Sequence, residues 1–147
     1  MSRTQFKAKT ATRLLLGAIF TVFGLNGFLH FMPQPPHAGL AAAFLGGLGA
    51  SGYFFPLLKG TEVIVGLLLL SNRFVPLALT VLAPVVVNIV AFHAFLDPSA
   101  LALPLVIAAL GVYLAYTERA VFAPLLQARS ADPVPQSNPR GHASATA

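Results

Sequence analysis

The sequence contains no cysteine, and only 9% of its 147 residues are charged. The absence of cysteine excludes disulfide bonds, thiolate metal sites and thiol redox chemistry. A soluble domain usually carries about 25% charged residues, so the few charges of this chain cannot cover a water-exposed surface. With 56% hydrophobic residues and a mean hydropathy of +0.79, the composition instead predicts an integral membrane protein, whose first partner is the lipid bilayer.

Motifs of soluble enzymes are missing as well. The chain has no phosphate-binding loop, no dinucleotide-binding glycine motif and no nucleophile elbow. On a soluble protein, its formal net charge of +5 would suggest nucleic-acid binding. Here the basic residues lie near the chain ends, where membrane orientation explains them better. We therefore expect no nucleic-acid partner, and no residue is assigned a catalytic role.

Four apolar runs, at about residues 13–32, 53–70, 74–96 and 99–117, are candidates for membrane-crossing helices. The first covers roughly 30 Å at about 1.5 Å per residue, which matches the hydrocarbon core of a bilayer. Short turns make the last three runs antiparallel neighbours. The sequence therefore predicts an all-α membrane protein with a four-helix antiparallel transmembrane bundle over residues 13–126.

The segments outside the bundle are polar. Residues 1–12 are basic, and a basic start before an apolar run also resembles a signal peptide. The run that follows is long for a signal peptide and contains Asn26 and His30, which favours a retained helix. Residues 127–147 are rich in proline, serine and alanine and are predicted to form a disordered cytoplasmic tail.

Prolines mark the boundaries between the predicted helices. The cluster from Pro33 to Pro36 is predicted to stop the first helix. Residues 37–51 carry no Lys, Arg, Asp or Glu and are too short to span, so they are predicted to form a helix in the membrane interface. Asp97 followed by Pro98 is typical of a helix start, where we expect the Asp side chain to cap the free N–H groups.

Glycines within the runs are expected to allow close helix packing, at positions Gly17, Gly24, Gly27 and Gly66. Basic residues predict the orientation of the bundle. They precede the first run, occupy the turn at Arg73 and follow the last run at Arg119 and Arg129, whereas the other two loops have no Lys or Arg. The positive-inside rule therefore places both termini in the cytoplasm.

Six polar side chains fall within the predicted spans, and their positions along the helices place all of them toward the outer face: Asn26, His30, Lys59, Glu62, Asn88 and His93. An ionisable group at the centre of a bilayer costs about 2.5–3.5 kcal/mol on insertion scales, and such groups usually mark functional sites. These six residues are therefore candidate ligand-binding residues.

Plainer roles compete with ligand binding at each position. Lys59 and Glu62 share a helix face at i,i+3 spacing, so they also fit a structural ion pair, and Lys59 can snorkel outward. His30 and His93 lie near the headgroup level, where a polar ring needs no ligand. They lack any spacing signature for haem, and Glu62 lies too deep to complete a metal site with them. We therefore expect no metal, and haem is the weaker cofactor hypothesis.

Several segments together resemble the DoxX family of small bacterial membrane proteins. The resemblance covers about residues 13–126 and rests on these motifs in this order: Arg13-Leu-Leu-Leu-Gly with Phe23-Gly-Leu-Asn-Gly-Phe-Leu-His30, Lys59-Gly-Thr-Glu62-Val-Ile-Val-Gly66, Asn72-Arg-Phe-Val-Pro-Leu-Ala-Leu, and Phe92-His-Ala-Phe-Leu-Asp-Pro98. The resemblance implies a four-helix bundle in the bacterial cytoplasmic membrane. It also implies a link to quinone-dependent oxidoreductase complexes, although most members have no assigned activity.

Two function hypotheses follow. The first is a quinone-linked membrane redox subunit, in which a quinone headgroup lies near Asn26, Lys59, Glu62 and Asn88 and the protein partners belong to a membrane redox complex. The second is a non-enzymatic component, either an assembly partner or a binder of a small solute or lipid. In the second hypothesis Lys59 and Glu62 form a structural pair.

Overall fold

The computed structural model describes residues 2–33 and 36–126, and over these ranges the chain is helical with no β-strand. The tail predicted to be disordered, at residues 127–147, lies outside the described residues. Five α-helices of at least 12 residues form the body of the molecule, followed by two short helices. In chain order the elements are α1 (Arg3–Leu29), α2 (Gly39–Ala50), α3 (Phe54–Leu70), α4 (Val75–Leu96), the 3₁₀ turn η1 (Pro98–Ala100), α5 (Ala102–Thr117), α6 (Arg119–Phe122) and η2 (Ala123–Leu126).

Helix α1 begins at Arg3, well before the apolar run that starts at residue 13. Ser2 caps it: the Ser2 hydroxyl accepts a hydrogen bond from the Gln5 N–H at 3.2 Å, and the Gln5 side chain accepts one from the Ser2 N–H at 2.9 Å. This reciprocal capping box satisfies backbone donors that would otherwise lack partners. The basic segment is therefore a helical extension of the first apolar helix.

The same helix ends at Leu29, before the proline cluster that was predicted to stop it. His30 adopts a left-handed conformation with a φ of 51°, which turns the chain out of the helix. The Asn26 side chain holds the turn, because its Oδ1 accepts from the Met32 N–H at 2.6 Å and its Nδ2 donates to the Met32 carbonyl at 3.3 Å. The end of α1 is thus set by Asn26 rather than by proline.

Helices α1 and α3 pack closely because glycines face one another across their interface. A Cβ atom at Gly17 would lie 3.0 Å from the Gly66 carbonyl oxygen, and one at Gly24 would lie 2.9 Å from the Val63 backbone nitrogen. At Gly66 a Cβ would lie 2.8 Å from the Gly17 carbonyl oxygen. These contacts confirm that the glycines allow close approach, as small residues do in membrane helix pairs.

The apolar core occupies one end of the helix bundle. Its members are buried residues from four helices: Leu16, Phe20, Val65, Leu69, Val75, Ala78, Leu79, Leu82, Ile107 and Leu114. The α4 members all come from its first half, and none of residues 83–96 is buried. We call the end with this core, which carries Lys9, Arg13 and Glu118, the closed end.

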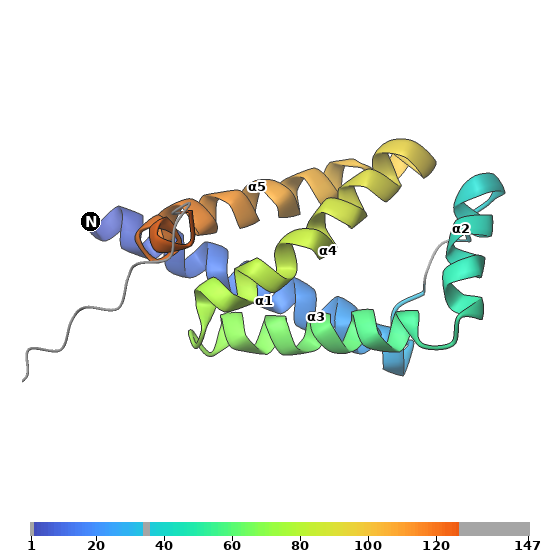
Figure 1. The fold of residues 1–147 in the computed structure, drawn as a ribbon, viewed down its shortest axis with the longest axis horizontal. Helices are drawn as coiled ribbons and strands as arrows, with labels where there is room; N and C mark the ends of the chain where they lie inside the picture. Colours follow the sequence, from blue (N-terminus) through green and yellow to red (C-terminus); the bar gives the residue numbers. More distant parts are fainter. Residues whose placement is uncertain (1, 34–35, 127–147) are drawn as a thin grey trace, which may run out of the picture.

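The opposite end carries His30, Tyr53 and Asp97, and we call it the open end. Figure 1 shows the pair α4–α5 lying against the pair α1–α3 at the closed end and separating from it toward the open end. The loss of buried residues along α4 agrees with this separation, because the helix leaves the core as it proceeds. The molecule is therefore a splayed arrangement of two helix pairs rather than a set of parallel rods.

Helix α2 lies across the open end. Its axis makes an angle of 90° with α3, and Figure 1 shows it standing crosswise to the long helices. The Phe44 ring packs on the Phe92 ring of α4 at 5.9 Å between centroids. Only Ala41 among its residues is buried, so α2 is attached to the bundle along a narrow contact.

The outward faces of the long helices are apolar. Leu57, Ile64, Val87 and Val112 are each more than 60% exposed. Soluble monomers rarely present apolar surface continuously on this scale. Helices α1 and α4 are long and apolar enough to cross a membrane, and the bent pair α2–α3 is a third candidate. The described part of the chain thus has the helices of a membrane protein.

Candidate functional site

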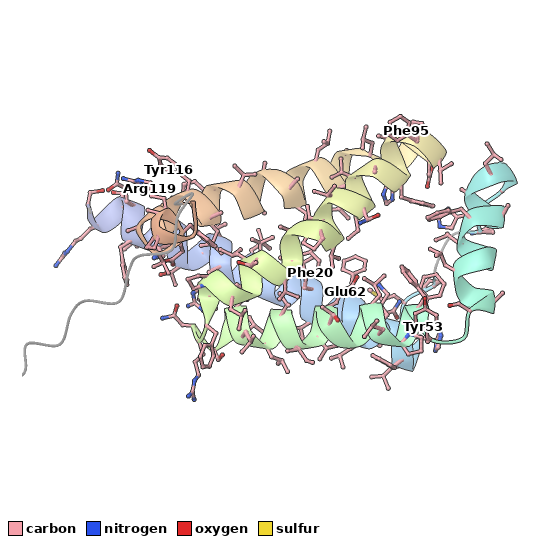
Figure 2. The ribbon with its side chains drawn as sticks, in the orientation of Figure 1. Phe20, Tyr53, Glu62, Phe95, Tyr116 and Arg119 are labelled. Carbon is pink, nitrogen blue, oxygen red and sulfur yellow. The ribbon has the colours of Figure 1, made fainter. Side chains whose placement is uncertain are left out.

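Lys59 and Glu62 form an ion pair on α3, in the half of the molecule that includes the open end. Lys59 Nζ donates to Glu62 Oε2 at 2.8 Å, as the i,i+3 spacing on α3 predicts. The Glu62 side chain is only 4% exposed, whereas the Lys59 side chain is 25% exposed. Figure 2 shows Glu62 on the face of α3 that is turned toward the other helices. The carboxylate is therefore buried, and the ammonium group reaches it from the rim.

The second carboxylate oxygen of Glu62 has no hydrogen-bond donor among the described residues. It also remains in contact with the molecular surface, since no fully buried side-chain nitrogen or oxygen in the described part of the chain lacks a partner. A carboxylate can accept about four hydrogen bonds, and Lys59 supplies one of them. Glu62 therefore keeps acceptor capacity that Lys59 does not use.

Glycines on α1 make room for this pair. A side chain at Gly27 would overlap the aliphatic stem of Lys59, and a Cβ at Gly24 would lie 3.0 Å from the Lys59 carbonyl oxygen. Lys59 thus lies flat against α1 before its ammonium group turns to Glu62. The sequence places Gly24 and Gly27 one helical turn apart, which keeps both on the face that receives α3.

Asn26 is buried at 4% exposure, but both ends of its side chain hold the backbone of Met32. A role in ligand binding would compete with these two hydrogen bonds. The arrangement makes Asn26 the residue that shapes the exit from α1, and its side-chain hydrogen bonds go to Met32 rather than to Lys59 or Glu62.

Asn88 and His93 each bond to the backbone of their own helix. Asn88 Nδ2 donates to the Pro84 carbonyl at 2.9 Å, and His93 Nδ1 lies 2.8 Å from the Ile89 carbonyl oxygen. His30 is exposed and forms the left-handed residue that ends α1. The structure therefore joins Lys59 with Glu62 by a direct contact, while Asn26, Asn88 and His93 bond to backbone groups of their own segments in the same half of the molecule.

No group of three His, Asp or Glu side chains within residues 2–33 and 36–126 lies close enough to hold a metal ion. His93 instead packs against the Phe92 ring at 5.1 Å between centroids. The chemistry that the candidate site can offer is thus hydrogen bonding: donors from the Lys59 ammonium group and an acceptor from Glu62.

Sequence reasoning missed the polar contacts that fasten the closed end. Arg13 is a buried residue, 8% exposed, and its Nη1 donates to the carbonyls of Leu69 and Leu70 at the end of α3. Lys9 Nζ lies 2.6 Å from Glu118 Oε1 at the end of α5. No packing role was predicted for these basic residues from the sequence, although a buried Arg facing a helix C-terminus pairs favourably with the helix dipole.

A second polar cluster, at the open end, was also missed. His37 Nδ1 lies 3.6 Å from Asp97 Oδ2, and the Ser99 hydroxyl donates to Asp97 Oδ1 at 2.7 Å. The expectation that Asp97 caps the fourth helix was wrong, because its side chain makes no capping hydrogen bond and a short 3₁₀ turn intervenes before α5. The carboxylate turns instead toward the segment that precedes α2.

Comparison with known proteins identified no relative of this chain. No family model matches the chain, and neither the curated proteins nor the solved structures give a match.

Proposed function

We propose that the chain is a four-span protein of the bacterial cytoplasmic membrane, with α1, α3, α4 and α5 crossing the bilayer and α2 lying in the outer interface. Helix α2 has 12 residues, about 18 Å at 1.5 Å per residue, which is too short to span. Its 90° bend from α3 suits a helix in the membrane plane. With α2 outside the span, an even number of crossings agrees with basic residues at both chain ends.

The function that the geometry supports best is binding of an amphiphilic small molecule of the quinone class at the Lys59–Glu62 pair. The observation that carries this proposal is the buried Glu62 carboxylate, 3% exposed as a residue, with one oxygen paired to Lys59 and the other open. A buried ionisable group inside a membrane helix is a functional candidate by default. The resemblance to DoxX motifs supports the same class of ligand.

A quinone headgroup matches the hydrogen-bonding groups of this pair in both redox states. Its carbonyl oxygens accept hydrogen bonds, and Lys59 has further N–H donors beyond the one on Glu62. The hydroxyl groups of the reduced form donate, and the open oxygen of Glu62 accepts. The apolar helix faces on either side suit an isoprenoid chain. Electron transfer to or from the headgroup then belongs to partner proteins in a membrane redox complex.

The test is equilibrium binding of a short-chain ubiquinone analogue to the purified protein in detergent. Glu62→Gln is expected to weaken binding roughly tenfold or more, because it removes a charged acceptor. Thr61→Val is the matched control, since the neighbouring Thr61 hydroxyl donates to the Leu57 carbonyl on its own helix. Absence of binding, or equal binding by Glu62→Gln and the unaltered protein, contradicts the proposal.

A structural role is the second candidate, and the packing of the Lys59 stem against Gly27 favours it. In that case the pair neutralises two charges within α3 while the Lys59 stem packs on α1, and no ligand is needed. Glu62→Gln would then lower the thermal stability of the protein without any quinone binding to lose. Measuring stability and binding on the same variants therefore separates the two candidates.

A further inference from the structure

The pocket at the open end is distinct from the Lys59–Glu62 pair. It lies where the segment before α2 meets the junction of α4 and η1, and its volume is about 360 Å³. Both polar and apolar side chains line it, including Pro36, His37, Ala41, Leu96, Asp97 and Ser99. This volume falls in the usual range for small-molecule sites, which combine an apolar wall with a few polar groups.

Asp97 is the polar group in this pocket with unused acceptor capacity. Its Oδ1 accepts from the Ser99 hydroxyl at 2.7 Å, which fixes the orientation of the carboxylate. Its Oδ2 lies 3.6 Å from His37 Nδ1, too far for a hydrogen bond. Since the side chain makes no helix-capping bond, most of the four or so acceptor positions of the carboxylate are left for a ligand.

The charge balance of the open end favours a cationic ligand. In the described ranges, Glu62 is paired with Lys59 and Glu118 with Lys9, whereas within 4 Å Asp97 faces the His37 ring and no Lys or Arg. Residues 14–58 and 74–118 contain no Lys or Arg. A carboxylate in a partly apolar pocket without a Lys or Arg partner attracts a positive charge.

We propose that this pocket binds a primary ammonium group, with the Asp97 carboxylate as its counter-ion. Ser99 holds the carboxylate in place, and the apolar wall at Ala41 and Leu96 covers the carbon atoms attached to the nitrogen. A primary ammonium group donates up to three hydrogen bonds, which the free acceptor positions of Asp97 receive. Two sources carry this group: a soluble amine, or the headgroup of an aminophospholipid at the membrane surface.

Calorimetric titration of the purified protein with ethylammonium chloride tests the proposal, with tetramethylammonium chloride as the cation that cannot donate. Ethylammonium is expected to bind, and tetramethylammonium to bind at least several-fold more weakly. Asp97→Asn, which keeps the side-chain shape, is expected to weaken ethylammonium binding roughly tenfold or more. Equal binding of the two cations, or unchanged binding by Asp97→Asn, overturns the proposal.

Further variants guard against a folding defect. Ala41→Leu fills the pocket without changing charge and is expected to lower ethylammonium binding as well. Ser51→Ala is the control, because the Ser51 hydroxyl bonds only within the turn before α3. Glu62→Gln is expected to leave ethylammonium binding unchanged, so this site and the quinone site succeed or fail separately. If Ser51→Ala or Glu62→Gln weakens ethylammonium binding as much as Asp97→Asn does, the assignment is contradicted.

Lipid nanodiscs distinguish the two sources of the ammonium group. If the lipid headgroup is the ligand, phosphatidylethanolamine in the nanodisc competes with ethylammonium. Ethylammonium is then expected to bind more weakly in nanodiscs of phosphatidylethanolamine than in nanodiscs of phosphatidylcholine. Equal binding in the two lipids identifies a soluble amine as the ligand. Absence of ethylammonium binding in both lipids and in detergent overturns the proposal.

Discussion

The two ends of the helix bundle are built from the same four long helices but by different means. At the closed end, apolar side chains from α1, α3, α4 and α5 meet in one core, and Arg13 and the Lys9–Glu118 pair fasten the helix ends. At the open end, the helix pairs separate, and the interior groups are Asn26, Glu62 and the Asp97 pocket. The apolar core therefore lies at one end, and the polar groups proposed to bind ligands lie at the other.

This division follows from the requirements of each task. A ligand site needs polar groups with unused hydrogen-bonding capacity, and such groups are costly in a packed interior. Separating them from the apolar core lets the core fix the helices while the open end remains accessible. Functional sites commonly occupy the less tightly packed part of a structure for this reason.

The largest effect is expected from breaking the Lys59–Glu62 pair at the open end. Lys59→Met leaves the buried Glu62 carboxylate without its partner and is expected to destabilise the protein by about 3–5 kcal/mol. The double variant Lys59→Met with Glu62→Met is expected to recover most of this loss, because no buried charge remains. Thermal unfolding in detergent measures both. An unaltered melting temperature in Lys59→Met would show that the open end is too hydrated to need the pair.

At the closed end, Arg13→Met is expected to cost about 1.5–3 kcal/mol, the range for hydrogen bonds to a charged group. The variant keeps the aliphatic stem but leaves the Leu70 carbonyl at the end of α3 without its donor. Lys7→Met is the matched control, an exposed basic residue on the same helix. Equal melting temperatures for the two variants would contradict a fastening role for Arg13.

The interface that continues through both ends is tested by a pair of glycine variants on α3. Gly66→Ala places a Cβ 2.8 Å from the Gly17 carbonyl oxygen and is expected to cost about 1–3 kcal/mol through overpacking. Gly60→Ala, on the same helix, meets no atom within 4 Å and is expected to be neutral or slightly stabilising. The difference between the two melting temperatures measures the packing of α1 on α3. If Gly66→Ala melts no lower than Gly60→Ala, the close contact is absent.

Much of the helix pattern could be predicted from hydropathy. Each of the four apolar runs overlaps one long helix, and the segment after the proline cluster forms the separate helix α2. Hydropathy did not predict where α1 begins and ends, because both ends depend on side-chain hydrogen bonds. The Ser2–Gln5 capping box was readable from its spacing, whereas the hold of Asn26 on Met32 depends on a turn geometry that no sequence pattern specifies.

The candidate site was less predictable than the helices. Helical rise gives the depth of a polar residue, and i,i+3 spacing correctly paired Lys59 with Glu62. Depth does not give the direction in which a side chain faces across the bundle. Asn88 and His93 were candidates because of their depth, and in the structure each bonds to the backbone of its own helix. The Asp97 cluster was missed because it needs two loops to meet, which depends on the separation of the helix pairs.

Spin-label distances test the separation of the helix pairs most directly, and the natural absence of cysteine makes the labelling clean. One double-cysteine variant, Leu67→Cys with Leu77→Cys, labels exposed sites of α3 and α4 near the closed end, and another, Leu57→Cys with Phe95→Cys, labels exposed sites near the open end. We predict a clearly longer distance between labels at the open end. Equal distances at the two ends, as in a bundle of parallel helices, would contradict the account.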